Sequence, residues 1–295
     1  MAGTGQGRVR VGTSGWTYDH WQGTFFPDGL ARRRRLEYLA GRLDTVEING
    51  TFYSLQRASS FRAWAAATPE DFRFAVKGSR YLTHMRKLRD VEEPLGRFLA
   101  SGLLALGPKL GPVLWQLPPN LGWDPERVEG FLRLLPRSTG EAAALGAAHT
   151  DRVPDPWTVT DEDRPIRHAL EPRHPSFATP ELVALLRAHD VALVVSDGAG
   201  FPCFDDVTAD LVYVRLHGHD ELYRSAYDAA ARDEWAAKVT AWAAGEAPVS
   251  PATIAPQDPP PPRGAGREVL VFFDNDAEGH APHDALALRD AVAEY

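Results

Sequence analysis

Two glutamates stand in short stretches of alternating apolar and polar residues and are suited to acid–base chemistry. Glu47 lies in TVEINGTFY (45–53), where a β-strand would bury the apolar face and turn Glu47 and Asn49 to the other face. Glu171 lies in a similar stretch, RHALEPR (167–173). Two carboxyl groups on separate strands could act as the acid and the base of a glycoside-type hydrolysis.

Basic residues in stretches of the same kind favour an anionic substrate. Lys77 lies near the end of FRFAVKGS, and Arg215 and His217 alternate with apolar residues in LVYVRLHG. Because a planar guanidinium pairs well with a carboxylate or a phosphate, these three residues are expected to form an anion-binding subsite. The alternative is that Asp197 and Glu171 neutralise the three cations internally.

The candidate site collects residues at the carboxyl ends of the predicted strands. The predicted catalytic residues are Glu47, Glu171, Asp197 and His217. The predicted substrate-binding residues are Trp16, Asn49, Tyr53, Lys77, Gln116, Arg173, Arg215 and Asn275. Trp16 and Tyr53 could stack on a sugar ring, although Trp16 could equally roof the fold without touching a ligand.

A metal site is conceivable from the ligand types of Glu47, Glu171, Asp197 and His217. No tight spacing of histidines and carboxylates supports it, so we predict neither a metal nor a cofactor. A metal-dependent hydrolase or isomerase stays open as an alternative.

Eight strand-like stretches separated by helical patterns would position these residues. They lie near residues 8–16, 45–53, 72–79, 111–119, 167–173, 192–198, 211–218 and 268–276. Only about a dozen residues join the sixth and seventh stretches, so the helix of that crossover must be short or degenerate. The pattern predicts a (β/α)8 TIM-type barrel of the α/β class. An open doubly wound sheet is disfavoured, because GTSGW after the first strand lacks the dinucleotide-binding spacing.

One domain is expected over residues 8–295, after a flexible start at 1–7. Residues 136–166 show no clean period and are interpreted as an insertion with one short helix around 141–148. The segment 246–266, here called the proline-rich segment, is expected to be an extended surface excursion with few buried contacts.

The composition is that of a soluble globular protein. The net charge of −8 disfavours attraction to nucleic acid or to an anionic membrane. Cys203 is the only cysteine, so no intrachain disulfide forms. No apolar leader or membrane-spanning run is present, which predicts a cytoplasmic protein.

Taken together, the motifs GTSGW, TVEINGTFY, FRFAVKGS, LGPVLWQLPP, EPRHPSF, YVRLHG and FFDND resemble the domain-of-unknown-function 72 family, also called YecE-like. The resemblance covers nearly the whole chain and implies a TIM-type barrel with a polar mouth, but little chemistry. The chain departs from the family pattern at FDND, where many members have two adjacent asparagines, and at Asp284, where an asparagine is common. Asp274 and Asp276 therefore imply a more acidic mouth.

Two classes of function remain open from the sequence. The first is an enzyme, hydrolase-like, that performs general acid–base chemistry on a small polar substrate, either anionic or sugar-like. The second is a non-catalytic barrel that binds a metabolite or a partner protein. The sequence leaves the substrate and the oligomeric state undefined.

Overall fold

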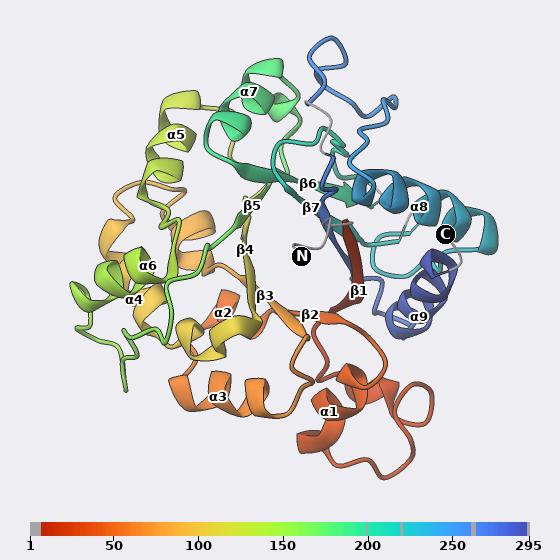
Figure 1. Cartoon of the computed structure of the whole chain (residues 1–295), viewed down its shortest axis with the longest axis horizontal. Coiled ribbons are helices and arrows are strands. Elements are labelled where there is room, and N and C mark those ends of the chain that lie inside the picture. Colours follow the sequence, from red (N-terminus) through yellow and green to blue (C-terminus); the bar gives the residue numbers. More distant parts are fainter. Residues whose placement is uncertain (1–6, 199, 219–220, 261–263, 294–295) are drawn as a thin grey trace. The chain divides into compact units, whose positions relative to one another are not determined.

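A closed barrel of parallel strands forms the fold. The computed structural model describes residues 7–198, 200–218, 221–260 and 264–293, and within these residues the strand order is β1-β2-β3-β4-β5-β6-β7-β8. The strands are β1 (Arg8–Ser14), β2 (Thr45–Ile48), β3 (Arg73–Lys77), β4 (Leu110–Gln116), β5 (His168–Glu171), β6 (Val191–Asp197), β7 (Leu211–Leu216) and β8 (Glu268–Phe273). This order, with helices between strands, confirms the predicted TIM-type barrel (Figure 1).

Helices follow most of the strands. They are α1 (Arg35–Ala40), α2 (Gly50–Tyr53), α3 (Ala58–Ala66), α4 (Glu92–Ala100), α5 (Pro125–Leu134), α6 (Thr139–Ala147), α7 (Pro180–Ala188), α8 (Ala229–Ala243) and α9 (Ala281–Val292). Among the described residues between β6 and β7 there is no helix, which confirms the predicted degenerate crossover. A flexible start is expected at residues 1–7. Residues 1–6 lie outside the described residues, and Gly7 is the first residue that the structure describes.

The chain divides into two compact units. One, the terminal unit, comprises Met1–Val46 and Ala178–Tyr295; the other, the central unit, comprises Glu47–Phe177. The expectation of a single domain stays a prediction.

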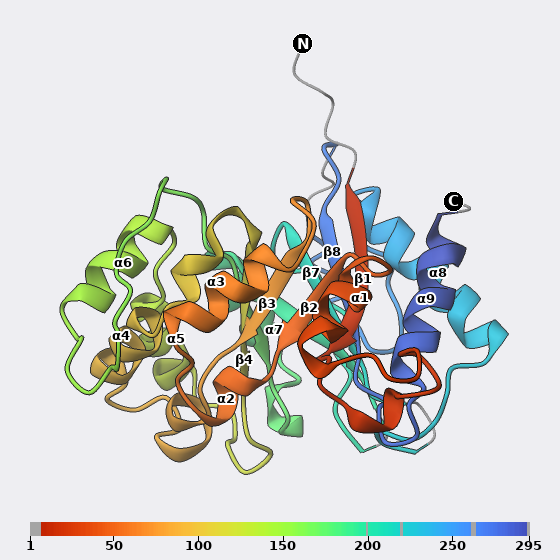
Figure 2. The same cartoon turned by 90° about the horizontal axis from the view of Figure 1, so that it is seen from below.

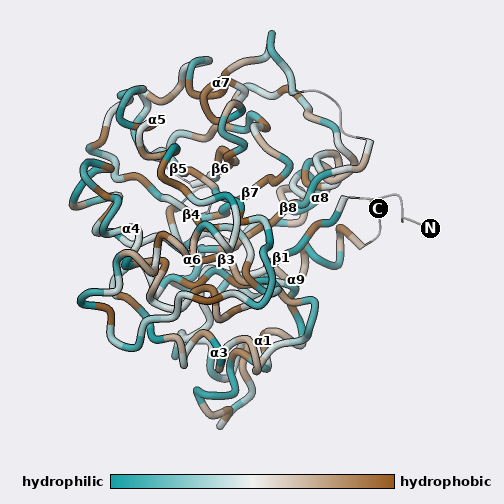
Figure 3. Tube along the Cα trace, turned by 60° about the vertical axis from the view of Figure 1, so that its left-hand side comes forward, coloured by the Kyte–Doolittle hydropathy of each residue, from teal (hydrophilic) through white to brown (hydrophobic). Residues whose placement is uncertain are grey.

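The terminal unit contains a parallel arrangement of β6, β7, β8 and β1, in that order. Apolar β-branched residues lie opposite one another, as where Val271 pairs with Val11 on one side and Val214 on the other. Figure 3 shows a hydrophobic stretch along β6. Helices α8 and α9 lie side by side, and α9 packs on β1 (Figure 1). The Asp228 side chain caps α8 by accepting from the Ala231 N–H at 2.8 Å.

The central unit contains β3, β4 and β5 in parallel, with α4 and α6 side by side (Figure 2). Trp115 of β4 packs against Phe98 and Phe131 of the covering helices, with ring centroids 5.7 and 5.2 Å away. Its indole N–H donates to Nδ1 of His168 at 3.2 Å. Side chains alternate along a strand, so burying Trp115 against the helices turns the next residue, Gln116, towards the barrel interior.

One predicted helix is shorter than expected. The sequence pattern predicts a helix over 94–106, but α4 ends at Ala100 and a short 3₁₀ helix, Leu103–Lys109, follows. The break lies at Gly102, whose φ is +121° and where a Cβ would lie 2.5 Å from the Cα of Ala58. Only glycine satisfies both conditions.

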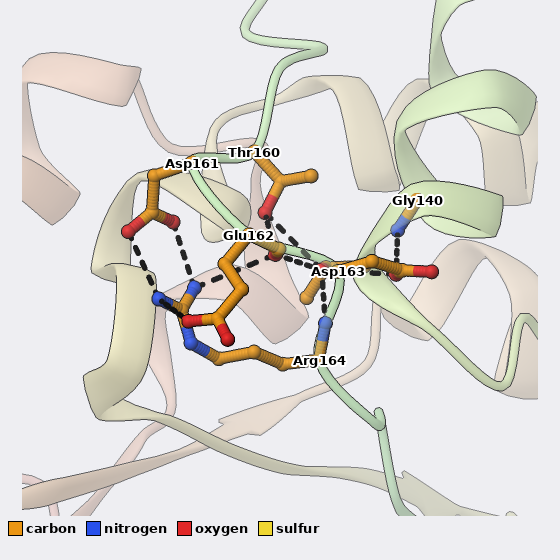
Figure 4. Close-up of polar contacts among 7 residues, drawn as sticks. Gly140, Thr160, Asp161, Glu162, Asp163 and Arg164 are labelled. Carbon is orange, nitrogen blue, oxygen red and sulfur yellow. Dashed lines mark hydrogen bonds and ion pairs between the residues drawn. The ribbon is translucent and has the colours of Figure 1, made fainter.

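Residues 136–166 are held by polar contacts within the central unit. The expected helix is α6, and the Asp163 carboxylate accepts from the Gly140 N–H at 2.7 Å near its start (Figure 4). Arg164 binds both carboxylate oxygens of Asp161, at 2.7 and 2.9 Å, and this pairing lowers the pKa of Asp161 to about 2. The contact between Asp163 and Gly140 therefore ties the two ends of this segment to each other.

The proline-rich segment is not the weakly attached excursion that the sequence suggests. Its described residues contain no helix or strand, as expected. However, the buried Asp206 accepts the N–H groups of Ile254 and Ala255, at 2.6 and 2.9 Å. The buried Asp205 accepts the Thr253 hydroxyl at 2.8 Å. The expectation of few buried contacts was wrong, because two aspartates outside the segment bind its backbone and side chains.

Candidate functional site

In the central unit, Glu171 lies at the end of β5 and is fully buried. Its carboxylate pairs with the Arg173 guanidinium and also accepts from the Gln116 amide at 2.8 Å. Gln116 and Glu171 are register partners on β4 and β5, so both side chains leave the sheet on the same face. Three of the predicted site residues are thus brought together here.

Lys77 and a histidine both contact the Phe52 ring in the same unit. The Lys77 ammonium lies 4.7 Å from the centre of the Phe52 ring, and the His84 ring lies 5.0 Å from it, edge to face. His84 belongs to the one-turn helix Tyr81–Met85, and its Nδ1 is 2.9 Å from the Thr83 hydroxyl. The half-buried imidazole is therefore positioned beside a cation.

Several charges act on His84. Partial burial, followed by the charges of Lys77, Arg80 and Arg173, holds the pKa of His84 below its usual range, while Glu171 opposes the shift. His84 is therefore neutral at pH 7 and can accept a proton. We call these five residues, Lys77, Arg80, His84, Glu171 and Arg173, the open centre.

Asn49 and Tyr53 lie just after β2, at the start and the end of α2. The Asn49 side-chain oxygen is buried and, among the described residues, accepts no hydrogen bond. The Tyr53 ring is 71% exposed and packs edge to face on Phe52 at 5.0 Å. The Thr51 hydroxyl donates to the Lys77 carbonyl at 2.6 Å and so fixes α2 to the end of β3. The Tyr53 ring therefore lies close to the open centre through Phe52, and an unsatisfied acceptor lies at the end of β2.

Glu47 is also fully buried in the central unit, at β2. Its pairing with Glu171 as acid and base stays a prediction.

The terminal unit contains a second polar cluster, at the ends of β1, β7 and β8. Arg215 lies 2.8 Å from Nε2 of His217 and donates to the Asp274 carboxylate at 3.1 Å and to the Ser14 hydroxyl at 3.3 Å. Nε2 of His217 is 3.4 Å from the same carboxylate. Arg215 is 1% exposed and His217 is 0% exposed. We call Ser14, Arg215, His217 and Asp274 the closed centre.

Asp274 forms an ion pair with Arg215 here, at 3.1 Å. The anion-binding subsite shared by Lys77, Arg215 and His217 stays a prediction.

Asp197 leaves β6 on the opposite face from the closed centre. Its register partner on β7 is Leu216, whereas Ser196 is the partner of Arg215. The Asp197 carboxylate accepts the Tyr227 hydroxyl at 3.1 Å. Its predicted catalytic role stays a prediction, and its contact with Tyr227 lies on the helix side of the sheet.

Asn275 is fully buried and joins two segments of the terminal unit. Its amide donates to the Ser225 carbonyl at 3.0 Å and to the Asp284 carboxylate at 2.8 Å. The same carboxylate accepts from the Tyr227 N–H at 3.1 Å. These contacts give Asn275 a structural task, and its predicted role in substrate binding stays a prediction. Trp16, in the same unit, is 8% exposed.

Asp276 follows β8 and binds the loop after β1. The Trp21 indole N–H donates to its carboxylate at 2.5 Å, and Nε2 of His20 lies 3.2 Å away. Burial raises the pKa of Asp276 to about 6, against the lowering contributions of Trp21 and His20. The Asp276 carboxyl therefore becomes protonated as the pH falls to about 6, whereas at pH 7 it keeps most of its negative charge.

His84 and Arg80 are the site residues that the sequence patterns missed. Both lie just after a predicted strand, in a segment without apolar periodicity. Their position after the strand that carries Lys77 was the available signal, because sites in such barrels are built from the loops that follow the strands.

No group of three or more His, Cys, Asp or Glu among the described residues is placed to hold a metal ion. Likewise, no helix in the described part of the chain is long and apolar enough to cross a membrane.

Comparison with solved structures gives the same fold. A crystal structure of a DUF72 family protein from Thermotoga maritima matches with a TM-score of 0.71 and 24% identity, over 97% of this chain and 99% of that chain. A DUF72 family protein from Enterococcus faecalis matches with a TM-score of 0.68 and 18% identity, over 97% and 96% of the two chains.

Curated relatives match over part of their length. The UPF0759 protein YunF of Bacillus subtilis is 30% identical over 138 residues, which are 45% of this chain and 48% of YunF. The UPF0759 protein YecE of Escherichia coli is 27% identical over 133 residues, 45% of each chain. The aligned part thus spans about half the length of these relatives. The model of the family described as "Protein of unknown function DUF72" matches residues 10–295, and the chain therefore belongs to the DUF72 family.

Proposed function

We propose that the protein is an enzyme that binds a small anionic substrate at the open centre and transfers a proton to or from it. The observation that carries this proposal is the neutral, half-buried His84 beside three cations, of which one, Arg173, pairs with Glu171. Lys77 and Arg80 add positive charge at a place where an imidazole can accept a proton.

An anion would relieve the electrostatics of the open centre. The three cations destabilise a protonated His84, and a bound carboxylate or phosphate would offset their charge. The pKa of His84 would then rise towards neutrality, where a general base that becomes a general acid is most effective. Binding and proton transfer are coupled through the same charges.

The rest of the region suits a small polar molecule. The buried Asn49 oxygen is an acceptor for a hydroxyl or amino group of the substrate. The exposed Tyr53 ring could pack on a sugar-like part of it. These features agree with hydrolase-like chemistry on an anionic or sugar-like substrate.

The test combines binding with turnover. Inorganic phosphate should raise the melting temperature in a saturable way, because a ligand that binds only the folded state stabilises it. Lys77→Met and Arg80→Met should weaken this effect, and Arg89→Met, an exposed arginine outside the centre, should not. In a screen of phosphorylated and glycosidic compounds, a compound turned over by the wild type should be lost with His84→Gln.

A non-catalytic binding protein is the second candidate. The observation in its favour is that Glu171 already binds both Arg173 and Gln116, so that its charge is used within the protein. Saturable phosphate binding without turnover in the screen would support this candidate. Absence of phosphate binding would contradict both.

A further inference from the structure

The terminal unit contains a cavity of about 410 Å³ on the helix side of β6. Asp197 at the end of β6 and the segment 226–228 form one wall, and one stripe of α8 forms the other. On that stripe, Glu234 and Trp235 lie next to each other, three and four residues after Ala231 and four and three residues before Lys238, so these residues line one side of the helix. The volume suits a small molecule rather than a single ion.

Carboxylates outnumber cations on the wall of this cavity. Among the described residues that line it, Asp197, Asp228 and Glu234 contribute three carboxylates, and Lys238 contributes the one cation. The Lys238 ammonium is bound 2.9 Å from the carboxylate of Asp205, which is not part of the wall. Its charge is therefore compensated from outside, and the cavity is left with an excess of negative charge.

Aromatic side chains complete the wall. The Trp235 ring lines the cavity, with the Lys238 ammonium 5.1 Å from its centre. The buried Tyr227 also lines it; burial and then the charge of Asp197 raise the pKa of its hydroxyl, which stays neutral and donates to Asp197. Carboxylates next to an indole face are the combination that binds organic cations, since the ring attracts a cation and packs on its alkyl part.

We propose that this cavity binds a small alkylammonium compound, with its ammonium groups at Asp228 and Glu234 and its alkyl chain along Trp235. The site shares no residue with the open centre, and it does not depend on the function proposed above. Asp228 keeps its capping contact with the Ala231 N–H through one oxygen, Oδ1. Glu234 is exposed, so its carboxylate is accessible from solvent.

The experiment is a calorimetric titration of the full chain with 1,4-diaminobutane, followed in parallel by tryptophan fluorescence. The neutral control ligand is 1-butanol, and sodium chloride at equal ionic strength controls for screening. Saturable binding of the diamine, a fluorescence change and no binding of 1-butanol are expected.

Variants locate the binding. Glu234→Gln and Asp228→Asn should each weaken it about threefold to fivefold, as for a solvent-accessible ion pair. Asparagine is a good N-cap residue, so Asp228→Asn keeps α8 intact. Asp233→Asn, which removes an exposed charge from the same helix but not from the cavity wall, should change nothing. No saturable binding, equal binding of 1-butanol, or equal effects of Glu234→Gln and Asp233→Asn would overturn the proposal.

Discussion

The closed centre and the open centre contain similar residues but differ in what surrounds them. Each has a carboxylate, an arginine and a histidine, at the ends of strands. In the closed centre, Arg215, His217 and Asp274 contact one another and are almost fully removed from solvent. In the open centre, Glu171 and Arg173 also form a buried pair, but His84 is half-buried and Arg80 is exposed.

This difference in solvent exposure decides whether a charged residue contributes mainly to the stability of the fold or to ligand binding. Charges that serve as each other's partners in a buried cluster mainly contribute to folding, because removing one leaves another without its partner. Cations that keep access to solvent contribute little to folding and are accessible to a ligand. Similar residue types can therefore have opposite consequences when substituted.

The largest effect is expected for Arg215→Met in the closed centre. It should lower the free energy of unfolding by about 3 kcal/mol, since it leaves Asp274 and the buried His217 without their shared partner. Arg80→Met in the open centre should change it by less than about 0.5 kcal/mol. Urea denaturation measures both, and equal losses would remove the distinction between the centres.

His168 sharpens the comparison, because it is a fully buried histidine of the central unit outside the open centre. Burial lowers its pKa to about 4, and its Nε2 lies 2.7 Å from the Pro136 carbonyl. A depressed histidine pKa adds stability above the unfolded value of 6.5, and this is lost as the pH falls from 6.5 towards 4. From pH 7.5 to pH 5, the loss should be about 2 kcal/mol.

Denaturation of wild type and His168→Gln at both pH values measures this contribution. Because His168→Gln lacks the titrating group, its free energy of unfolding should fall by about 2 kcal/mol less than that of the wild type between pH 7.5 and pH 5. An identical pH dependence would show that His168 contributes nothing to it.

Asp206 tests whether a buried aspartate can act purely as an anchor. Asp206→Ala should destabilise the protein by about 2 kcal/mol, because two backbone N–H groups of the proline-rich segment lose a charged acceptor. Limited proteolysis should cut the variant within that segment. Wild-type stability and protease resistance in the variant would show that the segment is held by other contacts.

The smallest effect on stability is expected for Lys77→Met. The aliphatic part of the side chain is retained, so the free energy of unfolding should fall by no more than about 0.5 kcal/mol. The pKa of His84 should nevertheless rise, because one of the cations that depress it is gone. An unchanged histidine pKa, measured by NMR titration, would contradict the assigned electrostatics.

The barrel was predictable from the sequence because strand alternation and helical spacing are local patterns. Glu171, Arg173 and Gln116 could also be placed, since they end two clear strands. The face of Asp197 could not, because Ser196 and Asp197 are both polar and only the register with β7 shows which of them shares the face of Arg215.

Contacts between distant segments were beyond the sequence patterns. Asp276 binds Trp21 across 255 positions, and Asp206 binds Ile254 across 48. In both cases the aspartate lies outside the helices and strands, where the sequence pattern does not distinguish a buried polar residue from a solvent-exposed one. His84 was missed for a related reason, since its role depends on charges contributed by two strands and their following loops.

The most direct measurement is an NMR titration of His84, without and with saturating inorganic phosphate. The proposed function predicts a pKa below 6.5 without phosphate and a higher pKa with it, because a bound anion offsets Lys77, Arg80 and Arg173. The shift should be absent in Lys77→Met combined with Arg80→Met. A His84 pKa that is the same with and without phosphate would contradict anion binding at the open centre.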